Sequence, residues 1–270
     1  MKARLSPACL RAALRLGAVS LLWLAMGAWA QGRPDCSRPL TLGLHEHGLL
    51  YSAETSTGID KDVADELIRR SGCRVHVSLM PRARIWQLIE SGALDFSLSG
   101  ISNDRRESFA AFAWYFSNKY YLLVRRDAKV ARIEDFERHK KLRLGVIRGF
   151  RYSETANRLV DALGGDQRLT LSSGLPALFS ALVGGQIDAM IIEPFDYPTL
   201  ESGRIRELTQ IIEFGDAPVP HGLIMSRASL SATEQARWRA LIDEMRGDGT
   251  MLRIFSKYFS PDLARAMVQF

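Results

Sequence analysis

The sequence contains little cysteine or histidine, and it lacks the motifs of the common cofactor and phosphate sites. Three cysteines and five histidines occur in 270 residues. There is no Gly-x-Gly-x-x-Gly turn, no P-loop lysine and no serine–histidine–aspartate pattern. Basic residues form no stripe interleaved with aromatic residues, which argues against a nucleic-acid partner. We therefore expect a protein without a cofactor, and the sequence gives no positive sign of catalysis.

Long apolar runs are also absent beyond the N-terminus. Four basic residues precede the apolar run 18–28, and Ala28-Trp29-Ala30 has the A-x-A form of a cleavage site. We expect residues 1–30 to be a signal peptide cleaved after Ala30, leaving an exported chain that is not embedded in a membrane. A membrane anchor is the alternative, but the run is shorter than the roughly 20 residues that span a bilayer. Removing these four basic residues lowers the formal charge from +6 to +2.

Two cysteines remain after this predicted cleavage, Cys36 and Cys73. An even pair in an exported protein favours a disulfide, and two free thiols are the alternative. Cys36 precedes the first predicted strand and Cys73 precedes the second. The two residues are therefore neighbours if those strands pair.

The chain repeats one organisation twice. Residues 40–98 read as strand, helix, strand, helix, strand, which predicts parallel strands joined by helical crossovers. A second pass of the same kind covers residues 142–192. A charged segment after residue 124 places a crossing between lobes near residues 119–126, and prolines in residues 215–222 indicate a return linker. Two similar lobes with two crossings suggest a hinged pair that closes on a ligand.

Residues 95–121 hold the strongest candidate for a binding site. A short strand from Asp95 is followed by small residues that can cap a helix, and Arg105 and Arg106 stand beside this cap. In open α/β sheets ligands bind at such strand ends, and a guanidinium matches a carboxylate in two-point geometry. A capped helix with solvated arginines explains the same residues equally well.

A second candidate is His45-Glu46-His47, which follows the first strand. Two histidines two residues apart share one face and suit a metal ion, but no third ligand is clustered with them. The two histidines more readily line a pocket or belong to an ordinary loop. We therefore expect no metal site.

Seven pieces of the sequence, in order, carry a resemblance to a known family. The chain resembles the family 3 extracellular solute-binding proteins, which have the type II periplasmic-binding fold and typically deliver polar amino acids to ABC importers. The pieces are LTLGL, GIDKDVADEL, LIESGALDFSLSGISNDRRE, FSNKYYLLVRR, LRLGVIRG, ALVGGQIDAMIIE and GDGTMLRIFSKYF. The resemblance implies an α/β fold of two hinged lobes with a ligand cleft between them.

The resemblance also implies roles for particular residues. Arg106 matches the arginine that binds the ligand carboxylate, although the preceding loop is one residue short, so Arg105 remains open. Ser99, Gly100 and Ser102 fall where the family uses backbone and hydroxyl groups. Glu193 falls where the family often has an aspartate that holds the ligand's amino group; a solvated loop carboxylate is the alternative.

The sequence departs from the family pattern at two places. After LRLGVIRG the family commonly has threonine or serine, whereas this chain has Phe150, Arg151 and Tyr152, which argues against a simple α-amino acid. The first loop lacks the family's aromatic cluster, so His45, His47 and Tyr51 would form that wall. Arg82 and Arg84 stand at the same predicted edge and could attract an anion; we include Arg84 in the predicted site and expect at least one of the two to be solvated.

The resemblance implies a monomeric periplasmic receptor that binds a small anionic or zwitterionic solute and presents it to an ABC transporter permease. We expect residues 31–121 with 220–270 to form one lobe and residues 122–219 the other. One alternative is an enzyme like the periplasmic cyclohexadienyl dehydratases, with Glu193 or His45 as general acid. Another is a sensory or accessory binding protein on the same fold.

Overall fold

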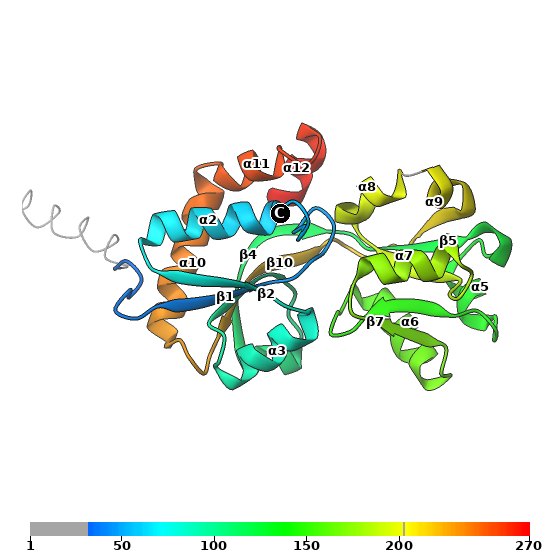
Figure 1. Cartoon of the computed structure of the whole chain (residues 1–270), viewed down its shortest axis with the longest axis horizontal. Coiled ribbons are helices and arrows are strands. Elements are labelled where there is room, and N and C mark those ends of the chain that lie inside the picture. The colour runs from blue at the N-terminus through cyan, green and yellow to red at the C-terminus, as the bar shows by residue number, and fades with distance from the viewer. Residues whose placement is uncertain (1–31, 202) are drawn as a thin grey trace, which may run out of the picture. The chain divides into compact units, whose positions relative to one another are not determined.

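Two five-stranded sheets, each with helices on both faces, make up the described part of the chain (Figure 1). The structure is a computed structural model that describes residues 32–201 and 203–270. The predicted signal peptide lies outside the described residues. Within them, no helix has both the length and the apolar character needed to cross a membrane.

The first sheet joins residues from both ends of the chain. Its order is β2-β1-β3-β10-β4, and β1 pairs in parallel with β2 and with β3, which confirms the predicted crossovers. β10 is antiparallel to both of its neighbours. The strands are β1 (Leu40–Leu44), β2 (Val75–Leu79), β3 (Phe96–Gly100), β4 (Ala110–Asn118) and β10 (Val219–Ser226).

Helices cover the first sheet on its two faces, and their apolar sides form the two parts of its core. Helices α2, α10, α11 and α12 pack on one face, while α3 packs on the other (Figure 1). The bounds are α2 (Ile59–Ser71), α3 (Arg82–Ser91), α4 (Asp104–Glu107), α10 (Ala232–Gly247), α11 (Thr250–Phe255) and α12 (Pro261–Val268).

The second sheet repeats this arrangement, with the order β7-β6-β8-β5-β9. β6 is parallel to β7 and β8, while β5 is antiparallel to β8 and β9. The strands are β5 (Tyr121–Arg125), β6 (Leu144–Ile147), β7 (Leu169–Ser172), β8 (Ala189–Ile192) and β9 (Thr209–Glu213). The helices are η1 (Arg126–Ala128), α5 (Ile133–Arg138), α6 (Glu154–Gly165), α7 (Leu175–Val183), η2 (Pro194–Asp196), α8 (Tyr197–Leu200) and α9 (Gly203–Leu208).

An aspartate at the start of the third strand explains why the two passes resemble each other in sequence. Asp95 accepts a hydrogen bond from the backbone N–H of Thr41 at 2.9 Å, and Asp188 accepts one from the backbone N–H of Arg143 at 2.8 Å. In each lobe the carboxylate thus ties the beginning of the third strand to the beginning of the first. The sequence therefore repeats an aspartate before the third strand because each lobe needs a carboxylate that links the starts of its first and third strands.

Three antiparallel strands, β4, β9 and β10, were not predicted from the sequence, and the expected return linker at residues 215–222 is partly wrong. β10 begins at Val219 and pairs with β4 from that residue on. Pro220, which cannot donate to a sheet ladder, faces only β4, because pairing with β3 begins at Gly222. In β4 eight of the nine residues are buried, so the alternation that marks a half-exposed strand is missing.

A disulfide fixes the start of the first lobe, and two segments of the chain connect the two lobes. A disulfide connects Cys36 with Cys73, whose Cα atoms are 4.9 Å apart. The chain leaves the first sheet after Asn118 and enters the second at Tyr121. It returns between Glu213 and Val219. Two adjacent segments therefore connect the lobes.

Phe195, just after β8, provides a further link between the lobes by packing. Its side chain is fully buried in the core of the first sheet, against Phe116 and Phe259. Its carbonyl accepts a hydrogen bond from the N–H of Leu49 at 2.9 Å. Gly48 allows this close approach, because a Cβ there would lie 2.2 Å from the carbonyl oxygen of Phe195. A residue that follows a strand of the second sheet is thus anchored in the first lobe.

We predict that Phe195→Ala lowers the free energy of unfolding by about 3–5 kcal/mol, because truncating a buried phenylalanine leaves a cavity. Denaturant unfolding followed by circular dichroism measures the change. Leu171→Ala is the matched control, since Leu171 is 54% exposed, and it should change stability by no more than about 0.5 kcal/mol. Equal effects of the two substitutions would show that Phe195 does not anchor the segment.

Candidate ligand-binding site

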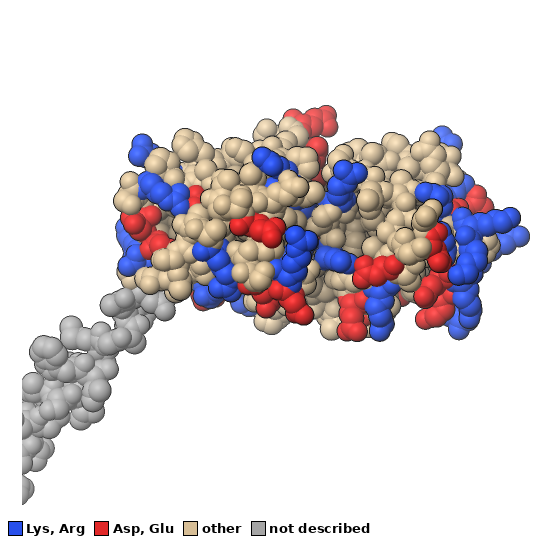
Figure 2. All heavy atoms as spheres, turned by 90° about the horizontal axis from the view of Figure 1, so that it is seen from below, with Lys and Arg blue, Asp and Glu red and all other residues tan. Residues whose placement is uncertain are grey.

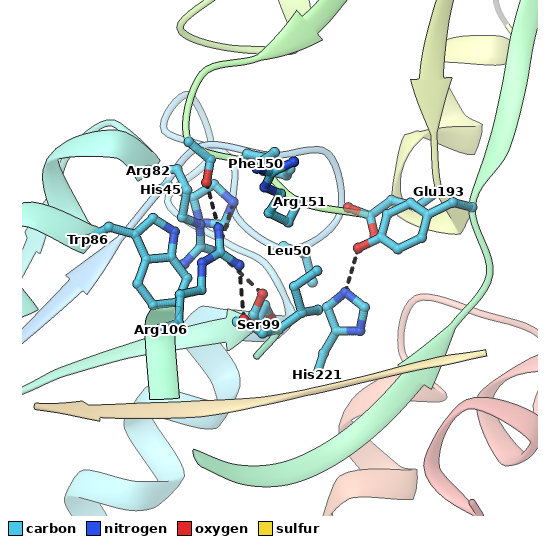
Figure 3. A pocket seen from close by; sticks show the side chains of 14 residues that line it. His45, Leu50, Arg82, Trp86, Ser99, Arg106, Phe150, Arg151, Glu193 and His221 are labelled. Atoms are coloured by element: carbon cyan, nitrogen blue, oxygen red, sulfur yellow. Dashed lines mark hydrogen bonds between the residues drawn. The ribbon is translucent and has the colours of Figure 1, made fainter. Parts of the chain in front are cut away.

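A small cavity lies between the two lobes, at the ends of β3 and β8 and beside the loop after β6. Its free volume is about 20 Å³, roughly the space of one water molecule. In Figure 3, Arg82, Arg106, His45 and Trp86 gather on one side and Glu193 and His221 on the other, with Leu50 between them. The lining residues are His45, Leu50, Arg82, Trp86, Ser99, Gly100, Ile101, Arg106, Tyr120, Gly149, Phe150, Arg151, Glu193 and His221.

Arg106 lies in this cavity and bridges the two lobes. Helix α4 positions it, since the side chain of Asn103 caps the helix by accepting a hydrogen bond from the N–H of Arg106. The guanidinium lies 3.9 Å from the centre of the Trp86 ring, a cation–π contact. It donates to the carbonyls of Ile101 at 2.9 Å and of Gly149 at 2.8 Å. Burial lowers the pKa of Arg106 to about 9, so the group remains charged at neutral pH.

Arg82 is a second buried guanidinium on the same side. It donates to the carbonyl of Leu98, at the end of β3, at 3.1 Å, and it lies 3.1 Å from Nε2 of His45. Burial lowers its pKa to about 10. Among the described residues, no carboxylate forms an ion pair with Arg82 or Arg106.

The contact with Arg82 fixes the tautomer of His45. Because Arg82 donates, Nε2 of His45 must accept, and the ring proton is then on Nδ1. Burial and the positive charge of Arg82 hold the pKa of His45 well below its usual range, so the ring is neutral. Nδ1 of His45 and Nε1 of Trp86 are both buried without a hydrogen-bond partner in the described part of the chain.

Glu193 faces this group from the opposite side and already has partners. One of its oxygens lies 2.6 Å from Nε2 of His47, and the other accepts from Asn118 at 2.8 Å. Asp196 also approaches His47, at 3.6 Å. Burial opposes charge on all three groups. The carboxylates nevertheless raise the pKa of His47, while His47 keeps the pKa of Glu193 below its usual range. Burial and Glu193 raise the pKa of Asp196 to about 7.

His221 and Tyr120 are site residues that sequence reasoning missed. His221 uses Nδ1–H to donate to the carbonyl of Val219 at 2.8 Å, so its Nε2 accepts from the Tyr120 hydroxyl, also at 2.8 Å. Burial lowers the pKa of His221 to about 4 and keeps the ring neutral. Tyr120 lies in the first segment that connects the lobes, and His221 lies in β10, just after the second. The sequence shows no motif that marks either residue.

Ser99 and Gly100 line the cavity, but the hydroxyl of Ser99 and the absence of a side chain at Gly100 serve the fold. The Ser99 hydroxyl donates to Asp60 at 2.5 Å, and its backbone N–H donates to the Tyr115 hydroxyl at 2.9 Å. Ser99 has a φ of 52°, an unusual conformation for a residue other than glycine and one that recurs at functional sites. A Cβ at Gly100 would lie 2.3 Å from Ile224, so packing against β10 requires glycine there.

Phe150 and Arg151 come from the loop after β6 and also line the cavity. The ring of Phe150 lies 5.1 Å from that of His47 and 5.6 Å from that of His45. Two wider grooves, of about 800 and 410 Å³, adjoin the cavity, and Phe150 lines both of them as well. Arg151 forms an ion pair with Asp161 at 3.0 Å.

On the face shown in Figure 2, basic and acidic side chains are mixed.

Five predicted or alternative residues do not line the cavity, and His47, described above, is one of them. Arg84 is exposed, so its inclusion in the predicted site is wrong, and Arg82 lines the cavity instead. Both residues lie in the first turn of α3, but only Arg82 faces β3. Arg105 is exposed and pairs with Glu90 at 3.5 Å. Tyr51 is half-buried against the core of the first lobe, and Ser102 is half-buried beside the cavity without lining it.

The fold and this interlobe cavity define a two-lobed binding protein of the type II periplasmic-binding class. The family model of the bacterial extracellular solute-binding proteins, family 3, matches residues 48–261. The chain belongs to this family. Comparison with curated protein sequences found no match.

Solved structures of similar fold include amino-acid-binding proteins. An ancestral arginine-binding protein bound to arginine aligns with a TM-score of 0.70 and 19% identity, over 84% of this chain and 100% of the other. The arginine-, lysine-, histidine-binding protein of Geobacillus stearothermophilus gives 0.69 and 18%, over 84% and 100%. A Streptococcus pneumoniae ABC uptake transporter substrate-binding protein with bound histidine gives 0.68 and 15%, over 82% and 92%. At these identities the likeness establishes the fold alone.

We predict that Glu193→Gln destabilises the protein more at pH 6 than at pH 8. His47 and Asp196 both have folded-state pKa values raised above their unfolded values, so this cluster loses stability as the pH rises through the folded values. At pH 6 the substitution removes the partner of a charged His47, which should cost about 3–5 kcal/mol. At pH 8 His47 carries less charge and Asp196 more, so losing the negative charge of Glu193 should cost less.

Urea unfolding at the two pH values measures this difference. Glu207→Gln is the control, because Glu207 is exposed on α9, and it should change stability by about 0.5 kcal/mol or less at both pH values. A cost of Glu193→Gln that is constant or grows with pH would contradict the assigned charges of the cluster.

Proposed function

We propose that this protein is a periplasmic receptor that captures a small anionic or zwitterionic solute, an amino acid or related organic acid, and delivers it to an ABC importer. The observation that carries the proposal is Arg106, a buried guanidinium in the interlobe cavity that donates to a carbonyl of each lobe. Such a group can exchange a backbone carbonyl for a solute carboxylate when the lobes close. Family membership and the shared fold support a solute-binding role.

In this proposal residues 31–121 with 220–270 move as one lobe and residues 122–219 as the other, after removal of a signal peptide at Ala30. A cavity of about 20 Å³ is too small for an amino acid, so the lobes must part to admit one. Arg106 then holds the carboxylate, and Glu193 is the candidate partner for a cationic group. The protein acts as a monomer that presents its closed form to the permease. We propose binding without chemical conversion.

We predict that Arg106→Ala weakens binding of the solute by roughly 30-fold or more, because the charged anchor is worth about 2 kcal/mol or more. Arg105→Ala is the matched control: the neighbouring residue is exposed, and its loss should leave affinity unchanged. Native mass spectrometry of protein purified from periplasm identifies a co-purified ligand. Thermal shift and calorimetry with amino acids and small organic acids then measure affinity.

Circular dichroism establishes that each variant is folded, and Arg106→Lys provides a second test if the alanine variant is not. Equal loss of binding in Arg105→Ala and Arg106→Ala would remove Arg106 as the anchor. If neither amino acids nor organic acids stabilise the wild-type protein, the receptor proposal fails.

Lobe closure depends in this proposal on Gly149, which touches α3 of the opposite lobe. A Cβ at this position would lie 2.9 Å from the Cα of Ala83, and Gly149 has a φ of +83°, which disfavours other residues. We predict that Gly149→Ala weakens solute binding by about tenfold, equivalent to about 1.4 kcal/mol, and enlarges the radius of gyration measured with saturating solute by X-ray scattering.

Gly165→Ala is the control for the glycine substitution. Gly165 ends α6, and an added Cβ there would have no atom within 4 Å. Its affinity and radius should match the wild type. Unchanged binding in Gly149→Ala would show that the contact with Ala83 is not required for capture.

A further inference from the structure

The hydrogen-bonding capacity left unused in the cavity is mostly donor capacity. Nδ1–H of His45 and Nε1–H of Trp86 are buried without partners in the described part of the chain. Arg106 donates only two hydrogen bonds to protein groups, although its guanidinium has five N–H groups. Buried donors of this kind are normally satisfied. A solute that satisfies all of them must present several acceptor oxygens on this side.

Glu193, in contrast, has little capacity left for a solute. It is the only carboxylate among the described residues that line the cavity. His47 contacts one of its oxygens at 2.6 Å and Asn118 the other at 2.8 Å. Both of its oxygens therefore already have a partner in the protein, and one of these partners, His47, has a raised pKa. A solute ammonium group is not needed to neutralise it and would compete with His47 for it.

The guanidinium groups of Arg82 and Arg106 lack an opposite charge in their direct contacts. Arg82 donates to backbone carbonyls, the Ser97 hydroxyl and His45, and Arg106 to backbone carbonyls. Asp60 acts on Arg82 through space without contacting it: its Oδ1 accepts from Ser99 and Tyr115, and its Oδ2 has no partner among the described residues. Two buried cations side by side are costly unless an anion joins them.

We propose that the solute is an organic acid with two anionic groups and no ammonium group. This rests on the proposed receptor function and narrows its solute class. One carboxylate takes the place of the Gly149 carbonyl on Arg106. The second lies beside Arg82, where the Nε–H of Arg82 donates to it. Trp86 and Phe150 cover the carbon chain between the two carboxylates.

Three probes of equal chain length test the proposal. Glutarate has two carboxylates and no ammonium group, L-glutamate adds the ammonium group, and glutaramate replaces one carboxylate with an amide. We expect calorimetry to give glutarate an affinity at least about tenfold higher than either of the others, a difference of about 1.4 kcal/mol. Equal or tighter binding of L-glutamate, or of glutaramate, overturns the proposal.

Variants of α3 locate the second anionic group. Arg82→Gln should weaken the binding of glutarate more than that of glutaramate, so that the tenfold preference for glutarate is lost. Arg84→Gln is the matched control on the same helix turn; this residue is exposed, and the preference for glutarate should persist. If Arg82→Gln does not fold, Arg82→Lys is tested instead. Lysine keeps the positive charge but lacks the two-point geometry of the guanidinium, so part of the preference for glutarate over glutaramate should be lost. A preference that is unchanged in a folded Arg82 variant overturns the assignment.

The same measurements separate this proposal from the receptor function. If amino acids stabilise the protein and glutarate does not, the receptor function stands and the dianion proposal fails. If neither amino acids nor dicarboxylates bind, both fail.

Discussion

Burying the guanidinium groups of Arg82 and Arg106 together is the constraint from which the rest of the site follows. Each group needs acceptors, and the end of β3 supplies them as backbone carbonyls. The left-handed turn at Ser99 belongs to this same strand end. His45 must keep its proton on Nδ1 to accept from Arg82, and Trp86 offers its ring face to Arg106. The neutral state of His45 is thus a consequence of its burial together with the positive charge of Arg82.

On the opposite side of the cavity the buried charges are mainly negative, so the carboxylates there need hydrogen-bond donors. Glu193 and Asp196 share His47, and Asn118 donates to Glu193. His221 stays neutral beside them because burial lowers its pKa to about 4, and its Nε2 accepts from the Tyr120 hydroxyl. A cavity of only about 20 Å³ therefore has a cationic side and a compensated anionic side, and this polarity would orient any bound solute.

Sequence reasoning predicted the parallel parts of the fold better than the antiparallel parts. The β-α-β-α-β passes have helical periodicity between apolar strands, and the repeated aspartate marks equivalent positions in both. β4 and β10 escaped prediction because both are buried on two faces and lie next to the segments that connect the lobes, so neither shows alternation.

Sequence reasoning likewise predicted only part of the candidate site. Arg106 and Glu193 were found because they occupy family positions, and both line the cavity. Arg82 and Arg84 could not be separated, since the helical phase of α3 relative to β3 is a tertiary property. His221 and Tyr120 lie 101 residues apart and meet only because the chain crosses between the lobes twice. Spacing along the sequence carries no signal for such a pair.

Phe195 has a mechanical consequence for the whole molecule. A body fixed to another at two neighbouring points can swing about the line between them, and a third attachment leaves this motion free only if it lies close to that line. The two connecting segments supply the first attachments, and the ring of Phe195, held between Phe116 and Phe259, supplies the third. The pivot of any opening must therefore pass close to this ring. The contact of Gly149 with Ala83 would then part while the ring of Phe195 stays buried in the first core.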